Sequence, residues 1–348
     1  MAEPIRAVRR CAPAFRAVIR YALITAIALA AFAAILLLAG KDPLKAYVDT
    51  FRQTLGNGYG FSELLVRMTP LILTAVAVAI PSRLGLINVG GEGQLYLGAW
   101  FASAGALLAP DLPRWLMLPL VLALGLAGGA AWAAIPGVLR ALKLVNETIA
   151  TLLLNYIAPL IVGYSVFGPW RDPAGSAYPQ SAPFADAARL PTFFNTRVHA
   201  GLLVSLAVLL GYWLIMEKTR WGLEMRAIGG NAEAANRLGL PVAAWVVIAL
   251  ALGGGVAGLA GMGEVMGIHG RLNQGLSPGY GFIGFLIAWL AGGRPLGILF
   301  MSFLFAIITS AGETLQITQG VPYSVVNLLL AMILFIVLSR RPARGAAR

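Results

Sequence analysis

Three polar side chains, Asn88, Glu92 and Gln94, lie among glycines in the otherwise apolar stretch LGLINVGGEGQLYLGAW, residues 84–100. A carboxylate in hydrocarbon costs several kcal/mol unless a partner or water faces it. The glycines weaken helix formation, and a broken helix at membrane depth is tolerated only beside a cavity or inside protein. The stretch therefore predicts an interrupted helix in which Glu92 faces a wet cavity or a partner.

Further polar residues occur inside other apolar segments. Thr148, Thr151 and Asn155 follow the spacing i, i+3 and i+7, which places them on one face of a helix. Glu264 lies among glycines near the end of another segment, and Asn327 lies in the last one. These residues either join helices by hydrogen bonds or line a water-filled path for a polar solute. Both interpretations stay open, and the opening stretch favours a path.

The sequence offers no chemistry of its own for bond making or breaking. His199 and His269, the 2 histidines, are far apart, and no cluster of metal-ligand residues accompanies them. The phosphate-binding pattern G-x-x-x-x-G-K-[ST] does not occur, and no nucleophile can be paired with a base. We expect a protein without catalytic residues, cofactor or metal that is not an enzyme.

The composition excludes a water-soluble globule. Of the 348 residues, 59% are hydrophobic and only 11% charged, whereas soluble domains carry about 25% charged residues. The net charge of +12 comes largely from arginines before the first apolar segment and after the last, which is typical of cytoplasmic ends and not of nucleic-acid binding. Cys11 is the only cysteine, so no intramolecular disulfide can form. The composition predicts an all-α, polytopic membrane protein.

About ten apolar segments are long enough, or nearly so, to cross a membrane as helices. An even number puts both termini on one side, with the loop 169–198 outside, the loop 217–240 inside, and more Lys and Arg inside. We expect one membrane domain, 1–348, with a basic cytoplasmic N-terminus, 1–20, and a basic tail, 339–348. The predicted spans are 21–40, 68–83, 86–109, 115–139, 148–168, 199–216, 241–267, 281–293, 295–311 and 323–338.

Two local patterns predict how helices pack and where a partner docks. Gly125 with Gly129, and Gly254 with Gly258, are spaced as in close contacts between helices. In the loop 217–240, residues 232–238 read as a short helix with Asn231 as its N-cap and an acidic first turn. This loop is either solvated or, given its apolar residues, docked in a groove of a partner.

Four stretches in order resemble one protein family: GLINVGGEGQLYLGAW, VNETIATLLLNYIA, TRWGLEMRAIGGNAEAANRLGL and SPGYGFIGFLIAWLAGGRPLGILFMSFLFAIITSAGE. These are similar to the permease subunits of ABC importers in the ribose and branched-chain amino acid group. The nucleoside and simple-sugar branch is the nearest. The resemblance runs from about residue 60 to 338.

The resemblance implies a type II importer fold of about ten helices per subunit, in a bacterial inner membrane. It also implies a second permease subunit, with a heterodimer favoured over a homodimer, two cytoplasmic ATPase subunits and an extracytoplasmic solute-binding protein. The loop 217–240 matches the family's segment that couples to the ATPase, with Trp221, Gly222, Arg226, Gly229, Asn231, Glu233, Ala234 and Ala235.

The expected function is therefore passage of a neutral hydrophilic solute, a nucleoside or a simple sugar. Branched-chain amino acid uptake is the alternative within the family, and an ion-coupled secondary transporter is the alternative from another class. Trp289 either stacks on a planar base or sugar or serves packing. The residues expected along the path are Asn88, Glu92, Gln94, Thr151, Asn155, Glu264, Tyr280, Trp289 and Asn327.

Overall fold

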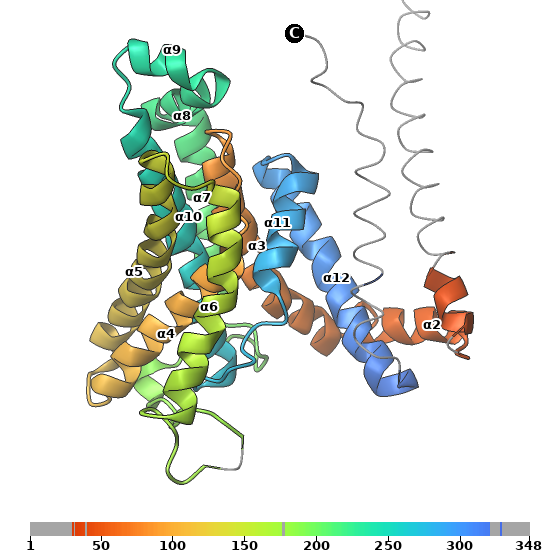
Figure 1. Ribbon diagram of the computed structural model, residues 1–348. Coiled ribbons are helices and arrows are strands. Elements are labelled where there is room, and N and C mark those ends of the chain that lie inside the picture. Colours follow the sequence, from red (N-terminus) through yellow and green to blue (C-terminus); the bar gives the residue numbers. More distant parts are fainter. Residues whose placement is uncertain (1–29, 31, 39, 176–177, 321–327, 329–348) are drawn as a thin grey trace, which may run out of the picture. The chain divides into compact units, whose positions relative to one another are not determined.

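The computed structural model describes residues 30, 32–38, 40–175, 178–320 and 328. Most of the predicted first and last spans, the two basic termini, Cys11 and Asn327 lie outside these residues. The described chain is mainly helical (Figure 1). Its elements are α2 (Pro43–Thr54), α3 (Gly58–Ser82), α4 (Gly91–Leu108), α5 (Arg114–Ala141), α6 (Glu147–Phe167), η1 (Asp186–Ala188), α7 (Gly201–Lys218), α8 (Arg220–Gly230), α9 (Ala232–Arg237), α10 (Val242–Glu264), η2 (Val265–His269), α11 (Tyr280–Ala291) and α12 (Pro295–Gln319).

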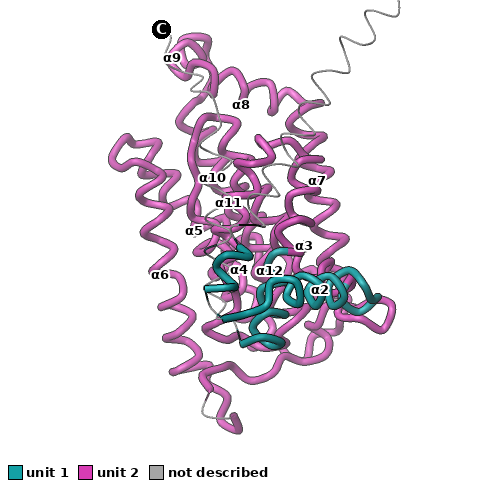
Figure 2. Tube along the Cα trace, turned by 90° about the vertical axis from the view of Figure 1, so that its right-hand side faces the viewer, with its two compact units in different colours: residues 1–60, 308–348 teal, residues 61–307 magenta. Residues whose placement is uncertain are grey.

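The chain forms two compact units, coloured separately in Figure 2. Unit 1 comprises residues 1–60 and 308–348, and its described core consists of Phe32, Leu36, Ala46 and Leu315. Unit 2 comprises residues 61–307 and carries all of the polar residues described below.

Six helices of the described residues are long and apolar enough to cross a membrane: α3, α5, α6, α7, α12, and α10 continued through η2. The predicted spans 68–83, 115–139, 148–168, 199–216, 241–267 and 295–311 correspond to these six, although α3 already begins at Gly58. Helix α11 has only 12 residues, so the segment predicted at 281–293 is shorter than the roughly 20 residues of a full crossing.

The glycines of unit 2 allow three helices to pack backbone to backbone. A Cβ added to Gly129 of α5 would lie 2.1 Å from the carbonyl oxygen of Gly254 of α10. A Cβ on Gly258 would lie 2.1 Å from the carbonyl oxygen of Gly125, and one on Gly98 of α4 would lie 2.2 Å from the Gly258 Cα. The predicted contacts through Gly125, Gly129, Gly254 and Gly258 are thus confirmed. They fix α4 against α5 and α10.

The helical path is interrupted where the glycine-rich stretch predicted it. Helix α3 ends at Ser82, residues 83–90 are not helical, and α4 begins at Gly91. Gly85 has a φ of +78°, a conformation that L side chains rarely adopt. The predicted span 86–109 is therefore a helix that starts only after this break.

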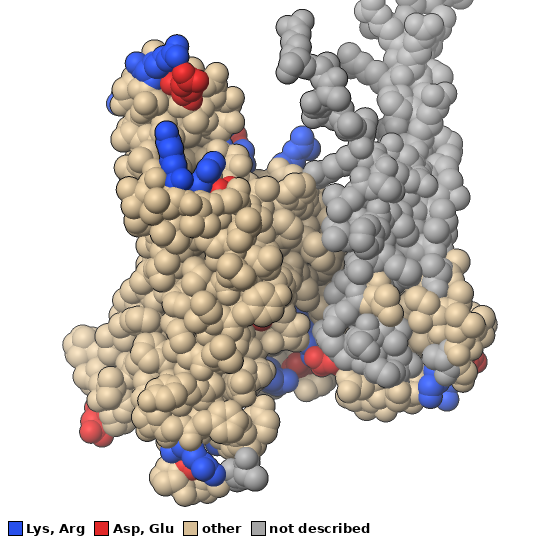
Figure 3. Space-filling view, viewed as in Figure 1, with Lys and Arg blue, Asp and Glu red and all other residues tan. Residues whose placement is uncertain are grey.

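The two ends of unit 2 differ in structure. Helices α8 and α9 lie at one end and the loop between α6 and α7 lies at the other (Figure 1). Figure 3 shows the charged side chains on one face of this unit gathered towards those ends, with a nearly uncharged band between them. Such a band fits the hydrocarbon region of a membrane.

Candidate functional site

The break between α3 and α4 is closed by its own side chains. The carbonyl oxygen of the Asn88 side chain accepts a hydrogen bond from the Gly90 N–H at 3.0 Å. Asn88 and Gln94 exchange two further bonds, with Asn88 Nδ2 donating at 3.1 Å and Gln94 Nε2 donating at 2.9 Å. Both side chains are buried, at 0% and 1% exposure. The pair satisfies polar groups that a break inside hydrocarbon would otherwise leave unpaired.

Helix α6 supplies the remaining partners of the broken segment. The Thr151 hydroxyl accepts from the Val89 N–H at 3.2 Å. The Asn155 side chain accepts from the Gly93 N–H at 2.8 Å and donates to the Val89 carbonyl, also at 2.8 Å. Asn155 thus replaces helical backbone bonds that the break removes. The polar face predicted on this helix is confirmed for Thr151 and Asn155, while Thr148 gives only its backbone carbonyl to Thr151.

Glu92 joins two helix beginnings. It lies in the first turn of α4 at 6% exposure, and its Oε2 accepts from the Gly281 N–H in the first turn of α11 at 2.7 Å. The Ser277 hydroxyl and the Gly279 N–H also bond to the carboxylate. A helix N-terminus carries about half a positive charge. The carboxylate therefore faces two partial positive charges.

The backbones of α4 and α11 meet at this carboxylate. A Cβ on Gly281 would lie 2.1 Å from the Glu92 nitrogen, so only glycine fits there. The second helix is also held by α3, because the Thr74 hydroxyl donates to the Tyr280 carbonyl at 3.1 Å. Sequence reasoning found Glu92 but not its partners Ser277 and Gly281, which lie about 190 residues away in the chain.

The other predicted path residues do not all join this cluster. Tyr280 is buried at the start of α11, and Trp289, at 39% exposure, packs on Phe285 at 5.7 Å between ring centroids. Glu264, at 4% exposure, ends α10, and its Oε2 lies 3.9 Å from His269 Nε2. Glu264 thus belongs to a separate group.

The group around Glu264 is ionic and joins several segments. Arg67 of α3 and Arg197 of the loop before α7 are charge partners of this carboxylate. Arg197 also pairs with Glu63 at 3.1 Å. The π-helical turn η2 follows Glu264 directly, and such turns occur often at functional sites.

His199 packs beside that turn. Its Nδ1 accepts from the Gly201 N–H at 3.1 Å, and a Cβ on Gly267 would lie 2.7 Å from its ring. Burial, with a smaller contribution from the Arg197 cation, lowers the pKa of His199 from 6.5 to about 4. The imidazole is therefore neutral at physiological pH.

Helices α8 and α9 occupy the loop predicted to couple to an ATPase. Asn231 caps α9, its side chain accepting from the Ala234 N–H at 2.9 Å, as predicted. Within α9, Glu233 pairs with Arg237, and Ala235 is buried while Ala234 is exposed. Gly222 allows α8 to pack closely against the end of α7, because a Cβ at this position would lie 2.2 Å from the Met216 carbonyl oxygen.

The remaining predicted coupling residues tie α8 to its neighbours. Trp221 meets Trp245 of α10 edge to face, at 5.7 Å between ring centroids. The Arg226 guanidinium donates to the Met216 carbonyl and lies 3.7 Å from Glu217. A Cβ on Gly229 would lie 2.2 Å from the Arg83 carbonyl oxygen. Helix α8 therefore rests directly on the first residue of the break.

Arg83 links these two parts. Its Nε donates to the Tyr212 hydroxyl at 3.1 Å, and its Nη2 donates to the Gly293 carbonyl at 3.2 Å and lies 3.6 Å from Glu217. Tyr212 also donates to the Gly293 carbonyl at 2.8 Å. A displacement of α8 would thus reach both the break and the end of α11.

Another ion pair missed by sequence reasoning holds the same break. Glu147, at the start of α6, is 5% exposed and pairs with Arg140 of α5 at 3.0 Å. Its other oxygen accepts from the Ile87 N–H at 3.4 Å. The sequence placed Glu147 beside the predicted N-terminus of that helix, but it did not predict the pairing with Arg140, seven residues earlier, or the bond from Ile87.

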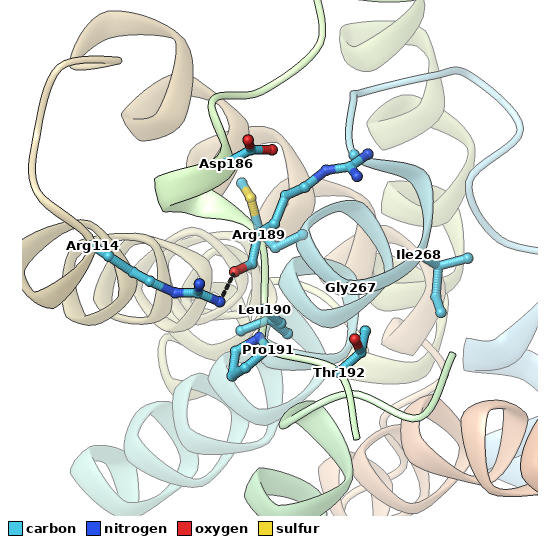
Figure 4. A pocket seen from close by; sticks show the side chains of 10 residues that line it. Arg114, Asp186, Arg189, Leu190, Pro191, Thr192, Gly267 and Ile268 are labelled. Atoms are coloured by element: carbon cyan, nitrogen blue, oxygen red, sulfur yellow. Dashed lines mark hydrogen bonds between the residues drawn. The ribbon is translucent and has the colours of Figure 1, made fainter. Parts of the chain in front are cut away.

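A cavity of about 560 Å³ (Figure 4) is lined in part by the loop between α6 and α7, which lies at the end of unit 2 opposite α8 and α9 (Figure 1). The Arg114 guanidinium donates to the Arg189 carbonyl at 3.1 Å on one side of it. The Arg189 side chain points the other way, against Gly270. Among the described residues, no three His, Cys, Asp or Glu side chains gather as ligands of a metal.

Comparisons with known proteins place this geometry in context. Residues 60–338 match the family model described as the permease component of branched-chain amino acid transport systems. A glucose ABC transporter permease of Haloferax volcanii is 37% identical, over 95% of this chain and 90% of that protein. A nucleoside ABC transporter permease of Lactococcus lactis is 32% identical, over 88% and 86%. A second nucleoside permease of that organism is 28% identical, over 72% and 80%.

Proposed function

The chain belongs to the family of branched-chain amino acid transport system permease components, and from this premise we propose that it is the membrane-spanning subunit of an ABC importer for a nucleoside or a simple sugar. As a member of that family it is a transport component of the plasma membrane and not an enzyme. The similarity to permeases named for glucose and nucleosides, over most of each chain, carries the proposal.

The two alternatives have less support. The family description names branched-chain amino acids, yet the relatives reported above are named for glucose and nucleosides. An ion-coupled transporter would be a different family. It would also need Glu92 or Glu264 to carry a proton, whereas the relatives reported above are named as ABC transporter permeases.

ATP hydrolysis is assigned to separate partner chains, because the sequence lacks a phosphate-binding loop. Helices α8 and α9 would receive them. Leu223 and Leu238 are exposed by 61% and 84% and Trp221 by 53%, which suits a groove on a partner better than water. We assign coupling to these helices, with Gly229 as the contact that transmits movement to the break.

The second permease would be a different chain. Two nucleoside permeases of one organism, Lactococcus lactis, both resemble this chain, at 32% and 28% identity. This pattern favours a heterodimer, completed by two ATPase subunits and an extracytoplasmic binding protein in a bacterial inner membrane.

In the membrane, the single domain 1–348 would cross about ten times with both termini cytoplasmic. The placement of α8 and α9 at one end of unit 2, and of the 169–198 loop at the other, supports the prediction that they lie on opposite sides of the membrane (Figure 1). Six candidate spans within the described residues leave room for the two predicted at 21–40 and 323–338.

The buried polar cluster would act along the path as a set of positioning residues. Asn88, Gln94, Thr151 and Asn155 hold the broken segment, and Glu92 holds the starts of α4 and α11. Tyr280, Trp289, Glu264 and Asn327 remain predicted path residues.

A binding measurement on the cognate extracytoplasmic protein tests the substrate class. Isothermal titration with guanosine, adenosine, glucose, ribose and leucine should give micromolar or tighter affinity for a nucleoside or a sugar. Binding of leucine alone would replace the proposal by the amino acid alternative.

A further inference from the structure

An apolar groove of about 430 Å³ lies on unit 2 between α3, α5, α7, α8 and α10. Gly211 and Ile215 of α7 and Gly255 of α10 line it, together with Trp221 and Met225 of α8. Nothing lies within 4 Å of a Cβ added to Gly211, so that glycine opens the groove instead of packing against a neighbour. The groove is part of neither the break nor the ionic group around Glu264.

The tyrosine hydroxyl at this groove is already occupied. Tyr212 also lines the groove, but its hydroxyl donates to the Gly293 carbonyl and accepts from Arg83. Ile248 and Leu252, two further lining residues, are exposed by 41% and 42%. The groove therefore offers apolar contact but no unused hydrogen-bonding group among these residues, which suits a hydrocarbon occupant.

The size of the groove argues against a helix as its occupant. One turn of a helix with side chains, about 10–12 Å wide and 5.4 Å high, fills on the order of 400–600 Å³. The groove therefore cannot enclose a helix, and a helix packed over it would place only its side chains inside. Four of its five helices are candidate membrane spans, so the surrounding medium supplies thin, flexible acyl chains.

Positive charge lies at one end of the groove. Gly211, Ile215 and Lys218 follow i, i+4 and i+7, which places the lysine backbone on the groove side of α7 at the end of that helix, and its ammonium lies 5.8 Å from the centroid of the Trp213 ring. Arg220 begins α8 directly before Trp221. Within the described part of the chain, no acidic side chain pairs with Lys218 or Arg220, whereas Glu217 lies 3.6 Å from Arg83. Such basic positions beside membrane-spanning helices bind anionic head groups.

We propose that this groove binds one acyl chain of an anionic phospholipid, whose phosphate lies at Lys218 and Arg220. Its assignment to the cytoplasmic leaflet rests on the orientation proposed above. Because Trp221 and Met225 form one wall of the groove, the bound lipid packs against α8 and helps to hold it in place. Coupling to the ATPase would then depend on anionic lipid.

Photolabelling of the purified transporter complex tests the groove itself. In vesicles of phosphatidylcholine that contain phosphatidylglycerol with a photoactivatable acyl chain, label should appear on peptides of α7, α8 and α10. Gly211→Leu places a side chain in the open space and should lower this labelling roughly tenfold, which corresponds to about 1.4 kcal/mol. Gly58→Leu, at another helical glycine with nothing within 4 Å, should leave it unchanged.

A second variant tests the head group. Lys218→Gln with Arg220→Gln should abolish the preference for phosphatidylglycerol over phosphatidylcholine while the acyl label remains on the same helices. Equal labelling of Gly211→Leu and wild type, no head-group preference in the wild type, or cross-links from the groove to another polypeptide would each overturn the proposal. The labelling experiment does not require transport. Its result therefore stands even if the uptake assay contradicts the proposed function.

Discussion

At the scale of single residues, the buried charge of the opening stretch has a structural explanation. Glu92 faces the starts of two helices and accepts a bond from Gly281 at 2.7 Å. The carboxylate balances two helix dipoles, and its burial requires no water. A wet cavity is therefore not needed to explain Glu92, and we propose that it positions the path and does not touch the solute.

Glu92→Gln keeps the shape of the side chain and removes its charge. Bonds to charged groups contribute about 1.5–3 kcal/mol and neutral ones about 0.5–1.5 kcal/mol, so we expect a loss of roughly 1–2 kcal/mol of stability. Uptake should fall to a similar degree for every transported solute. Thermal unfolding in detergent and competitive uptake measure the two effects.

Asp111→Asn, which removes an exposed charge in the turn after α4, is the control and should change neither quantity. If Glu92→Gln altered the choice among solutes at unchanged stability, the carboxylate would contact the solute directly.

His199 predicts a pH dependence of stability. Its folded pKa of about 4 lies below the ordinary 6.5, so the unfolded chain binds the proton more readily. The contribution of the neutral imidazole to the free energy of unfolding is complete above pH 6.5. It is lost as the pH falls towards 4, by about 3 kcal/mol in total. His199→Asn, whose side-chain oxygen can still accept from Gly201, should flatten this part of the profile. For each protein, the change in melting temperature from its value at pH 7.5 is measured throughout pH 4–7. The same change in wild type and variant would contradict the assignment.

At the scale of elements, local signals predicted what depends on neighbouring residues in the chain. The glycines marked the break at 83–90, Asn231 marked the start of α9, and paired glycines marked the contact of α5 with α10. The partner of Glu92 could not be predicted, because Gly281 lies 189 residues away and only the fold brings it close. The pair of Arg140 with Glu147 was also missed, although the two residues are only seven apart, because they lie on different helices, α5 and α6, and only the packing of these helices brings the side chains together.

Neighbouring glycines of α8 test the coupling helix. In Gly229→Val the added atoms meet the Arg83 carbonyl, since a Cβ alone would approach it to 2.2 Å. Overpacking of this kind costs about 1–3 kcal/mol, and we expect ATP hydrolysis to lose its stimulation by the loaded binding protein. Gly230→Val, with nothing within 4 Å of its Cβ, is the matched control and should retain stimulation. Normal uptake and stimulation in Gly229→Val would remove this contact from the coupling route.

At the scale of the whole molecule, the account depends on the direction in which unit 2 crosses the membrane. Sequence patterns predicted this direction from arginine placement, because hydrophobicity alone is the same in both directions. The opposite ends occupied by α8 with α9 and by the loop before α7 give two places at which to test it (Figure 1).

Cysteine labelling in a Cys11→Ser background tests this topology. Phe194→Cys, at a residue 91% exposed in the loop before α7, should react with an impermeant maleimide added outside intact cells. Leu238→Cys, at a residue 84% exposed after α9, should react only after the membrane is opened. The reverse pattern would invert the predicted orientation.

Reconstituted uptake tests the central claim most directly. Proteoliposomes would contain this chain, the second permease and the ATPase subunits, with the binding protein outside and ATP inside. The account predicts accumulation of a labelled nucleoside or sugar that requires both ATP and the binding protein and is unaffected by dissipating the proton gradient. Accumulation without ATP that collapses with the proton gradient would contradict it.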